Sequence, residues 1–236
     1  AAASPAMAQD SGSSEAMRKS AAIVAGSPDR RIVVVSATSG TTNRLLEIHA
    51  ASIKDAAAAI RAVDEVKARH LSQAESLGCG PETMAAIEEI IRELVTEIVG
   101  SDRSTGERLD RILAFGERLS ALLFVRALAS AGRPAVALDS RKFLRTDSYF
   151  GKAEPDLPET RRLGAKLLAR LNESAEMIVL EGFVGSDGAG RTTTLGRGGS
   201  DYSAALFGEA LSATAVEIWT DVAGILTMDP RVVPSA

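Results

Sequence analysis

Hydrophobic and polar positions alternate along the chain with two periods, one typical of buried strands and one typical of helices. Residues 32–35 read Ile-Val-Val-Val between polar residues, which predicts a strand buried on both faces of a parallel sheet. Similar runs predict strands at 135–138, 177–180 and 215–219, with helices at about 158–172 and 200–213 between the last three. This alternation predicts βαβ units, and hence an α/β sandwich that binds ligands at the carboxyl ends of its strands.

A long helix-rich segment interrupts this alternation. Apolar residues recur with helical spacing from about 42 to 132, with breaks near 78–81 and 100–101, so we predict a helix-rich insertion between strands. Residues 1–14 show neither period, and they lack the basic and apolar regions of a signal peptide. We expect them to be a disordered or atypical lead, and we assign residues 15–236 to a single body.

Composition restricts the classes of function. The chain has 236 residues, of which 45% are hydrophobic and 25% charged, proportions that exclude a disordered chain, collagen or a coiled coil. Its 27 basic and 31 acidic residues give a net charge of -4, so no overall field attracts nucleic acid or an anionic membrane. No apolar run reaches the ~18 residues of a membrane-spanning helix. Any bound anion must therefore be held by local groups.

Cysteine and histidine offer little chemistry. The single cysteine, Cys79, cannot form an internal disulfide, which fits a reducing, cytoplasmic setting. His49 and His70 lie in helical segments without partners at metal-binding spacing, so we predict surface or core roles for them and no metal site.

The segment at 190–201, Gly-Arg-Thr-Thr-Thr-Leu-Gly-Arg-Gly-Gly-Ser-Asp, carries the densest candidate chemistry. Its glycines let the backbone approach a ligand, and the helix that follows directs unpaired N–H groups toward an anion. An ordinary capping loop is the alternative. A helix cap needs fewer hydrogen-bond donors than this segment offers with Arg191, Arg197 and the hydroxyls of Thr192–Thr194. We therefore favour phosphate or carboxylate binding.

Glu117 is the second candidate. It lies in a helix predicted at 104–131, on the margin of the apolar stripe, whereas Arg118 points to the solvent side. A carboxylate at that margin is partly buried, so it is either paired structurally or lines a cleft and meets a positive group of a substrate. Spacing alone leaves both interpretations open.

Two polar segments directly follow predicted strands, where α/β folds bind ligands. One runs from Trp219 through Asp221 to Arg231, and its alternative interpretation is a simple turn. The other, Ser36–Asn43, is either a helix cap or an active-site turn.

Together these motifs resemble those of the aspartokinases of the amino acid kinase family, from about Glu15 to the last residue. The segments that carry the resemblance are VSATSGTTN (35–43), FGERLS (115–120), RTD (145–147), FGKAEP (150–155), EGFV (181–184), GRTTTLGRGGSD (190–201) and WTDVAGILTMDPR (219–231). The resemblance implies a three-layer α/β/α sandwich with a mainly parallel central sheet. It also implies an enzyme that phosphorylates the side-chain carboxylate of aspartate with ATP and Mg²⁺, the metal being held mainly by the nucleotide phosphates.

The resemblance further implies roles for individual residues. Those expected around the substrate aspartate are Ser36, Thr42, Glu117, Phe183, Arg197, Ser200 and Asp201. Among them, Arg197 and Asp201 would be catalytic. Glu117 would meet the ammonium of aspartate and Arg197 its α-carboxylate, which agrees with their chemistry. Those expected against the nucleotide are Thr220, Asp221 and Arg231.

One stretch departs from the family pattern. Where the family has a strand and a phosphate-cradling Lys-Phe-Gly-Gly-Thr-Ser turn, residues 5–10 read Pro-Ala-Met-Ala-Gln-Asp. Family members also continue beyond the equivalent of residue 236 into further catalytic sequence and ACT domains. We therefore expect a partial catalytic domain with one sheet position unfilled and with little or no activity.

We expect the full-length form to be a cytoplasmic homodimer that catalyses the first step of lysine, threonine and methionine synthesis. A non-catalytic aspartate-binding or oligomerisation module is the alternative.

Overall fold

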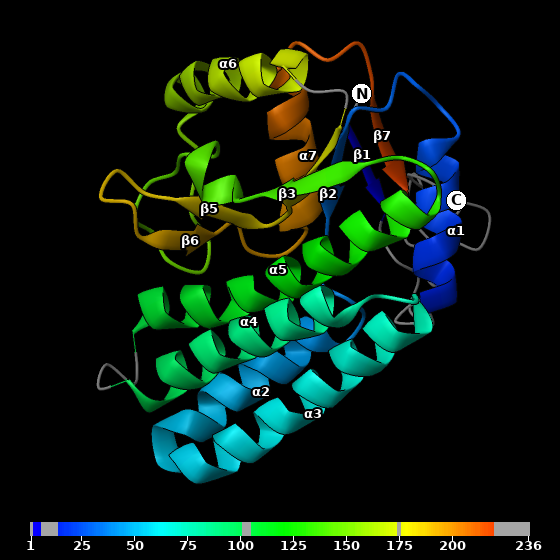
Figure 1. Cartoon of the computed structure of the whole chain (residues 1–236). Helices are drawn as coiled ribbons and strands as arrows, with labels where there is room; N and C mark the ends of the chain where they lie inside the picture. Colours follow the sequence, from blue (N-terminus) through cyan, green and yellow to red (C-terminus); the bar gives the residue numbers. More distant parts are fainter. Residues whose placement is uncertain (1, 6–13, 101–104, 174–175, 220–236) are drawn as a thin grey trace, which may run out of the picture.

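The computed structural model describes residues 2–5, 14–100, 105–173 and 176–219. A five-stranded parallel sheet lies at its centre, in the order β3-β4-β2-β1-β7 (Figure 1). The strands are β1 (Ala2–Pro5), β2 (Ile32–Val35), β3 (Ala135–Leu138), β4 (Met177–Glu181) and β7 (Val216–Trp219). The four strands predicted from the sequence are confirmed, each within one residue of its predicted bounds.

Strand β1 corrects the prediction for the first residues of the chain. It pairs in parallel with both neighbours, so that Ala2 lies opposite Ile32 of β2 and Val216 of β7. Ala2–Pro5 are therefore ordered, and the sheet position that we expected to be unfilled is occupied. Residues 6–13 of the expected disordered or atypical lead lie outside the described residues, so the expectation for them stays a prediction. The absence of a hydrophobic period at residues 1–14 did not reveal strand β1, because strand formation depends on the neighbouring strands as much as on β-branched residues.

Helices cover both faces of the sheet, which confirms the three-layer α/β/α sandwich. Alternate residues of the strands point to opposite faces. Val33 and Val179 belong to a core shared with α1 (Ser14–Ala25) and α5 (Gly106–Ser130). Val34 and Leu180 belong to a second core, which contains residues of α6 (Leu157–Glu173) and α7 (Gly199–Ala210). Both α6 and α7 occur where the sequence predicts helices.

The predicted insertion folds as helices that pack side by side below the sheet in Figure 1, next to α5. They are α2 (Thr41–Lys54), α3 (Ala56–Ser76) and α4 (Pro81–Val99). The break between α2 and α3 was not predicted. Asp55 makes it, because its backbone is extended and its carboxylate accepts a hydrogen bond from the Ala58 N–H at 3.0 Å, which caps α3.

A short antiparallel hairpin was also not predicted. Strands β5 (Val184–Ser186) and β6 (Thr192–Thr194) form it, and both are buried. A short 3₁₀ helix, η1 (Ser140–Lys142), lies against β5. The hairpin places the glycine-rich segment at 196–199 between β6 and the start of α7.

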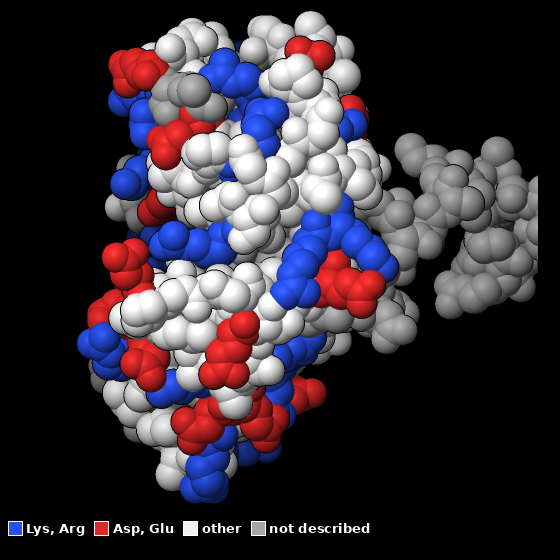
Figure 2. Space-filling view, turned by 45° about the vertical axis from the view of Figure 1, so that its right-hand side comes forward, with Lys and Arg blue, Asp and Glu red and all other residues white. Residues whose placement is uncertain are grey.

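Charged side chains of both signs are interspersed on the face shown in Figure 2. They do not gather there into one large patch of a single sign. Within the residues that the structure describes, no helix is long and apolar enough to cross a membrane.

Candidate functional site

A cavity of about 500 Å³ opens where the ends of β2 and β4 approach the starts of α2 and α7 and the middle of α5. Its position at the carboxyl ends of parallel strands is the one that an α/β fold favours for ligands. The residues that line it are Ser36, Thr42, Asn43, Leu46, Leu113, Glu117, Phe183, Gly196, Arg197, Gly198, Gly199, Ser200 and Asp201.

All seven residues predicted around the substrate line this one cavity. Ser36 follows β2, Thr42 lies in the first turn of α2, and Glu117 comes from α5. Phe183 lies between β4 and β5, and Arg197, Ser200 and Asp201 lie at the start of α7. The structure therefore brings together residues far apart in sequence, while their individual roles stay predictions. Thr220, Asp221 and Arg231, predicted for the nucleotide, lie outside the described residues.

Glu117 is almost fully buried, with 3% of its surface exposed. One carboxylate oxygen, Oε1, accepts a hydrogen bond from the Ala37 N–H at 3.3 Å, and the other, Oε2, is buried without a hydrogen-bond partner among the described residues. Burial raises the pKa of Glu117 to about 8, although the Ala37 N–H opposes the shift. Glu117 lines the cavity and has no ion pair among the described residues, while its contact with a positive group of a substrate stays a prediction.

A glycine brings Glu117 to this position. A Cβ on Gly116 would lie 2.9 Å from the Cβ of Ala37, so only a glycine lets α5 approach the loop after β2 this closely. Thr38 connects this loop to α2 and α3, because its hydroxyl contacts the hydroxyl of Thr41 at 2.8 Å and Nε2 of His70 at 3.3 Å. His70 is fully buried, and burial lowers its pKa to about 4, so it serves as a neutral core residue.

The opposite wall of the cavity offers positive groups. Arg197 is exposed and has no ion pair with any described residue. Gly198, with a positive φ of 73°, precedes α7 and provides no side-chain cap. The N–H groups of Ser200 and Asp201 meet no backbone acceptor in the described part of the chain. A guanidinium and an uncapped helix N-terminus together favour a carboxylate or phosphate ligand.

The preceding hydroxyls do not belong to this anion site, contrary to our prediction. Thr194 donates to Asp110 at 2.7 Å, and the hydroxyl of Thr193 contacts that of Thr146 at 2.7 Å. Thr192 accepts from Arg141 at 3.2 Å. All three threonines are buried in β6 and stabilise the hairpin.

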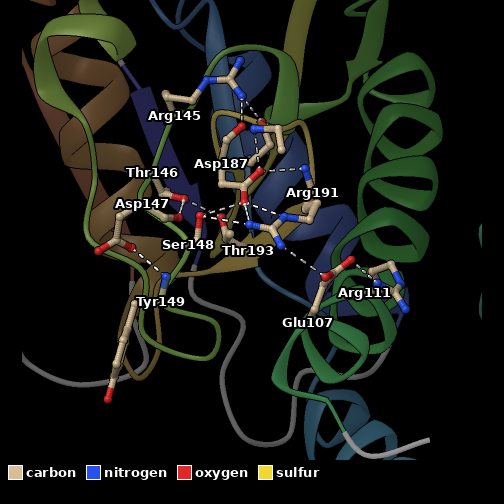
Figure 3. Close-up of polar contacts among 12 residues, drawn as sticks. Glu107, Arg111, Arg145, Thr146, Asp147, Ser148, Tyr149, Asp187, Arg191 and Thr193 are labelled. Carbon is tan, nitrogen blue, oxygen red and sulfur yellow. Dashed lines mark hydrogen bonds and ion pairs between the residues drawn. The ribbon is translucent and has the colours of Figure 1, made fainter. Parts of the chain in front are cut away.

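Arg191 was also assigned wrongly to anion binding. Figure 3 shows its guanidinium between the carboxylates of Asp187 and Glu107, at 2.6 Å and 3.7 Å. Burial alone would raise the pKa of Asp187. Hydrogen bonds from Arg191, Ser148 and the Ala189 N–H outweigh that effect and lower the pKa to about 2. Arg191 thus neutralises the buried carboxylate of Asp187, which is charged at neutral pH.

A second hollow, of about 580 Å³, lies beside α4 and α5. Arg118, expected on the solvent side, lines it half-buried and pairs with Glu93 at 2.7 Å. The other arginines of this hollow, Arg111 and Arg141, are also paired with carboxylates. Since its guanidinium groups are already neutralised, this hollow is a weaker anion site than the cavity around Arg197.

Three residues of the cavity were missed by the sequence analysis as individual site residues. Asn43 lies in a motif that we singled out, but Leu46 and Leu113 carried no signal beyond their helical spacing. Apolar side chains in a ligand cavity cannot be distinguished by period from core residues. No group of three His, Cys, Asp or Glu side chains that could hold a metal ion occurs among the described residues.

The cavity therefore presents carboxylates and positive groups to the same space. Glu117 and Asp201 can receive an ammonium, and Arg197 with the N–H groups of α7 can receive a carboxylate. Such a pattern complements a small amino acid that carries charges of both signs.

Comparison with known proteins agrees with this geometry. The amino acid kinase family matches residues 6–236. The chain is 41% identical over 224 residues to lysine-sensitive aspartokinase 3 of Escherichia coli strain K12, covering 94% of this chain and 49% of that protein. It is 37% identical over 202 residues to an aspartokinase of Chlamydia trachomatis, covering 85% of this chain and 44% of that protein.

A solved structure agrees as well. Aspartokinase III of E. coli, crystallised with aspartate and ADP, superposes with a TM-score of 0.89 and 38% identity, covering 100% of this chain and 52% of that chain. The chain thus spans about half the length of the relatives it matches. Because the family match extends over residues 6–236, almost the whole chain, the chain belongs to the amino acid kinase family.

Proposed function

We propose that the cavity binds aspartate and that the protein transfers the γ-phosphoryl group of ATP to the aspartate side chain. The observation that carries this proposal is the set of acidic and basic groups that line one cavity and form no ion pair with any described residue: Glu117 and Asp201 on one hand, Arg197 on the other. Aspartate has one ammonium and two carboxylates, which these groups complement. The similar E. coli aspartokinase III structure, which contains aspartate and ADP, supports the choice of ligand.

In this proposal Glu117 receives the ammonium and Arg197 the α-carboxylate. The side-chain carboxylate then lies toward the first turn of α7, where the N–H groups of Ser200 and Asp201 meet no acceptor among the described backbone groups. We propose Arg197 and Asp201 as the catalytic residues, with Ser36, Thr42, Phe183 and Ser200 completing the walls.

The reaction depends mainly on positioning. A side-chain carboxylate oxygen attacks the γ-phosphorus, the bond from that phosphorus to the bridging oxygen breaks, and ADP leaves. Holding the ammonium and the α-carboxylate orients that oxygen, which removes much of the entropic cost of the encounter. Thr220, Asp221 and Arg231 remain our proposal for the nucleotide side. Mg²⁺ bound to the ATP phosphates would neutralise their charge.

The sequence of residues 5–10 leads us to expect slow phosphoryl transfer by this chain. They contain neither lysine nor glycine, so the phosphate-binding turn that the family resemblance leads us to expect is not found there. Loss of one preorganised contact to a developing charge costs roughly 100-fold in rate. We therefore propose slow turnover by the 236-residue chain. For the whole protein we propose a cytoplasmic homodimer that acts in lysine, threonine and methionine synthesis. Analytical ultracentrifugation of the whole protein tests the proposed dimer by its sedimentation.

An acyl phosphate assay tests the function. The chain is incubated with ATP, Mg²⁺ and aspartate, and hydroxylamine converts any aspartyl phosphate into a hydroxamate. We expect a signal with aspartate, none with glutamate, and a rate about 100-fold or more below that of the E. coli enzyme measured alongside. Aspartate binding without any hydroxamate would favour the non-catalytic module. Absence of aspartate binding would contradict both functions.

A further inference from the structure

The turn that carries Phe183 is strained. Phe183 has a positive φ of 67°, which a bulky residue rarely adopts. The Val184 N–H donates to the Gly182 carbonyl at 2.8 Å across it, which closes a three-residue γ-turn of the uncommon, positive-φ kind. Such a conformation persists only where surrounding contacts hold it. Backbone hydrogen bonds hold the turn to other segments, since the Leu195 N–H donates to the Phe183 carbonyl at 3.0 Å. The Gly182 N–H likewise donates to the Val35 carbonyl at 2.8 Å.

One buried hydroxyl also joins this turn to α7. The Phe183 N–H donates to Oγ of Ser203 at 2.8 Å, and the same Oγ donates to the Gly199 carbonyl at 2.7 Å. Ser203 is fully buried in α7 and does not line the cavity. Serine in a helix commonly bonds the carbonyl four residues earlier, but here its acceptor side is used by a strained residue of another segment.

The turn and the helix start also touch without space between them. A Cβ on Gly199 would lie 2.7 Å from Cδ2 of Phe183, and a Cβ on Gly182 would lie 2.7 Å from Oγ of Ser200. The two segments are therefore in close contact, and the Ser203 hydroxyl adds a hydrogen bond between the turn and α7. Phe183 and Ser200 both line the cavity.

We propose that Ser203 is a positioning residue of the site, whose hydroxyl fixes the Phe183 turn against the first turn of α7 and so sets the shape of the aspartate cavity. The inference rests on the proposed function for the identity of its ligand. Without the hydroxyl, the partly buried Phe183 N–H has no acceptor among the described residues and the turn is free to relax. The aromatic ring and the walls from Ser200 to Asp201 then lose their relative placement.

The test compares Ser203→Ala with Ser52→Ala in the 236-residue chain. Ser52 is a matched control, because it is equally buried, donates to the His49 carbonyl at 2.7 Å and accepts from Arg108 at 3.0 Å, but it does not line the cavity. Calorimetry measures aspartate affinity, and hydrogen exchange without ligand measures protection of the Phe183 amide. We expect Ser203→Ala to weaken binding about tenfold or more and to speed that exchange about tenfold.

Ser52→Ala should change neither quantity, whatever it does to the melting temperature. Aspartate affinity within twofold of wild type in Ser203→Ala, or an equal loss in Ser52→Ala, would overturn the proposal. Ser203→Thr retains the hydroxyl and should bind within threefold of wild type; binding as weak as in the alanine variant would also overturn it. If the wild-type chain binds no aspartate, the proposed function is refuted. The role of Ser203 is tested separately, and it is refuted if the Phe183 amide exchanges equally fast in Ser203→Ala and in wild type.

Discussion

Glu117 has one carboxylate oxygen that accepts a hydrogen bond from the Ala37 N–H and another that is buried without a partner in the part of the chain that the structure describes. Its pKa of about 8 results first from burial, and the nearby buried carboxyl of Glu181 adds to the shift. Glu181 itself has a pKa raised to about 7, mainly by burial. At pH 7 Glu117 is therefore mostly protonated in the ligand-free protein, and an ammonium beside it would favour the charged form.

Proton release on aspartate binding follows from this shift. Below pH 8 the bound ammonium drives deprotonation of Glu117, so up to one proton should leave per aspartate bound at pH 7. Affinity should strengthen as pH rises, by about tenfold per unit at most, and become constant above pH 8. Titration calorimetry in buffers with different ionisation enthalpies measures the released proton.

Glu117→Gln is the control for that measurement. It should release no proton and bind aspartate about 100-fold more weakly at pH 8.5, because truncation of a buried charge partner costs on the order of 3 kcal/mol. Identical binding enthalpies in all buffers for the wild-type chain would contradict the assignment of the ammonium to Glu117.

At the scale of elements, the carboxylate of Asp110 connects α5 with the hairpin and with the loop at 150–151. It is fully buried and accepts hydrogen bonds from the Gly151 N–H at 2.9 Å, the Thr194 N–H at 2.9 Å and the Thr194 hydroxyl at 2.7 Å. Burial raises the pKa of Asp110, although these hydrogen bonds oppose the rise. One side chain thus links three segments of the chain.

Asp110→Ala should destabilise the protein strongly. Removal of the carboxylate leaves the N–H groups of Gly151 and Thr194 without the acceptor that they share in the fold, at a cost of about 2–3 kcal/mol. Urea unfolding measures the loss. Asp64→Ala, at an exposed position on α3 without a partner among the described residues, should shift the midpoint far less. Equal midpoints for both variants would show that the hairpin is held by other contacts.

Gly182 couples the end of β4 to the start of α7. Because its Cβ would lie 2.7 Å from Ser200, Gly182→Ala should push the two elements apart, weaken aspartate binding about tenfold and cost about 1–3 kcal/mol of stability. Gly188→Ala is the matched control, since its Cβ would meet nothing within 4 Å. Calorimetry and thermal unfolding measure both quantities. Unchanged affinity in Gly182→Ala would show that the cavity tolerates a shift of α7.

The elements differ in how far the sequence could predict them. The strand at Ile32–Val35 could be predicted because a β-branched run identifies a buried strand from its own residues. Strand β6 could not be predicted, because the burial of Thr192–Thr194 depends on partners such as Asp110, which lies 84 positions before Thr194. The same three hydroxyls therefore looked like ligand donors. Glu117 could be located by helical period, but its lack of an ion pair depended on tertiary packing.

At the scale of the whole molecule, β1 completes a continuous sheet between the two helical layers. It separates β2 from β7 and pairs with both. The first residues escaped prediction because their pairing partners lie about 30 and over 200 positions later, at Ile32 and Val216. Small residues there carry no local strand signal.

A proline in β1 tests that placement. Ala3 lies opposite Val33 on one side and Glu217 on the other, so Ala3→Pro removes a backbone donor from a central strand. We expect a loss of about 3 kcal/mol in urea unfolding, by analogy with proline in a regular element. Ala3→Ser, which keeps the N–H, should cost much less. Equal unfolding midpoints for the two variants would place the first residues outside the sheet.

The central claim is that the cavity around Arg197 is an aspartate site, and calorimetric titration of the chain with L-aspartate at pH 8 tests it most directly. We predict saturable binding to one site, weakened about tenfold or more in Arg197→Ala, because a hydrogen bond to a charged group contributes about 1.5–3 kcal/mol. Arg162→Ala, which removes an exposed arginine of α6 paired with Glu159, should bind as wild type does. No saturable heat with the wild-type chain, or equal affinities in all three proteins, would contradict the claim.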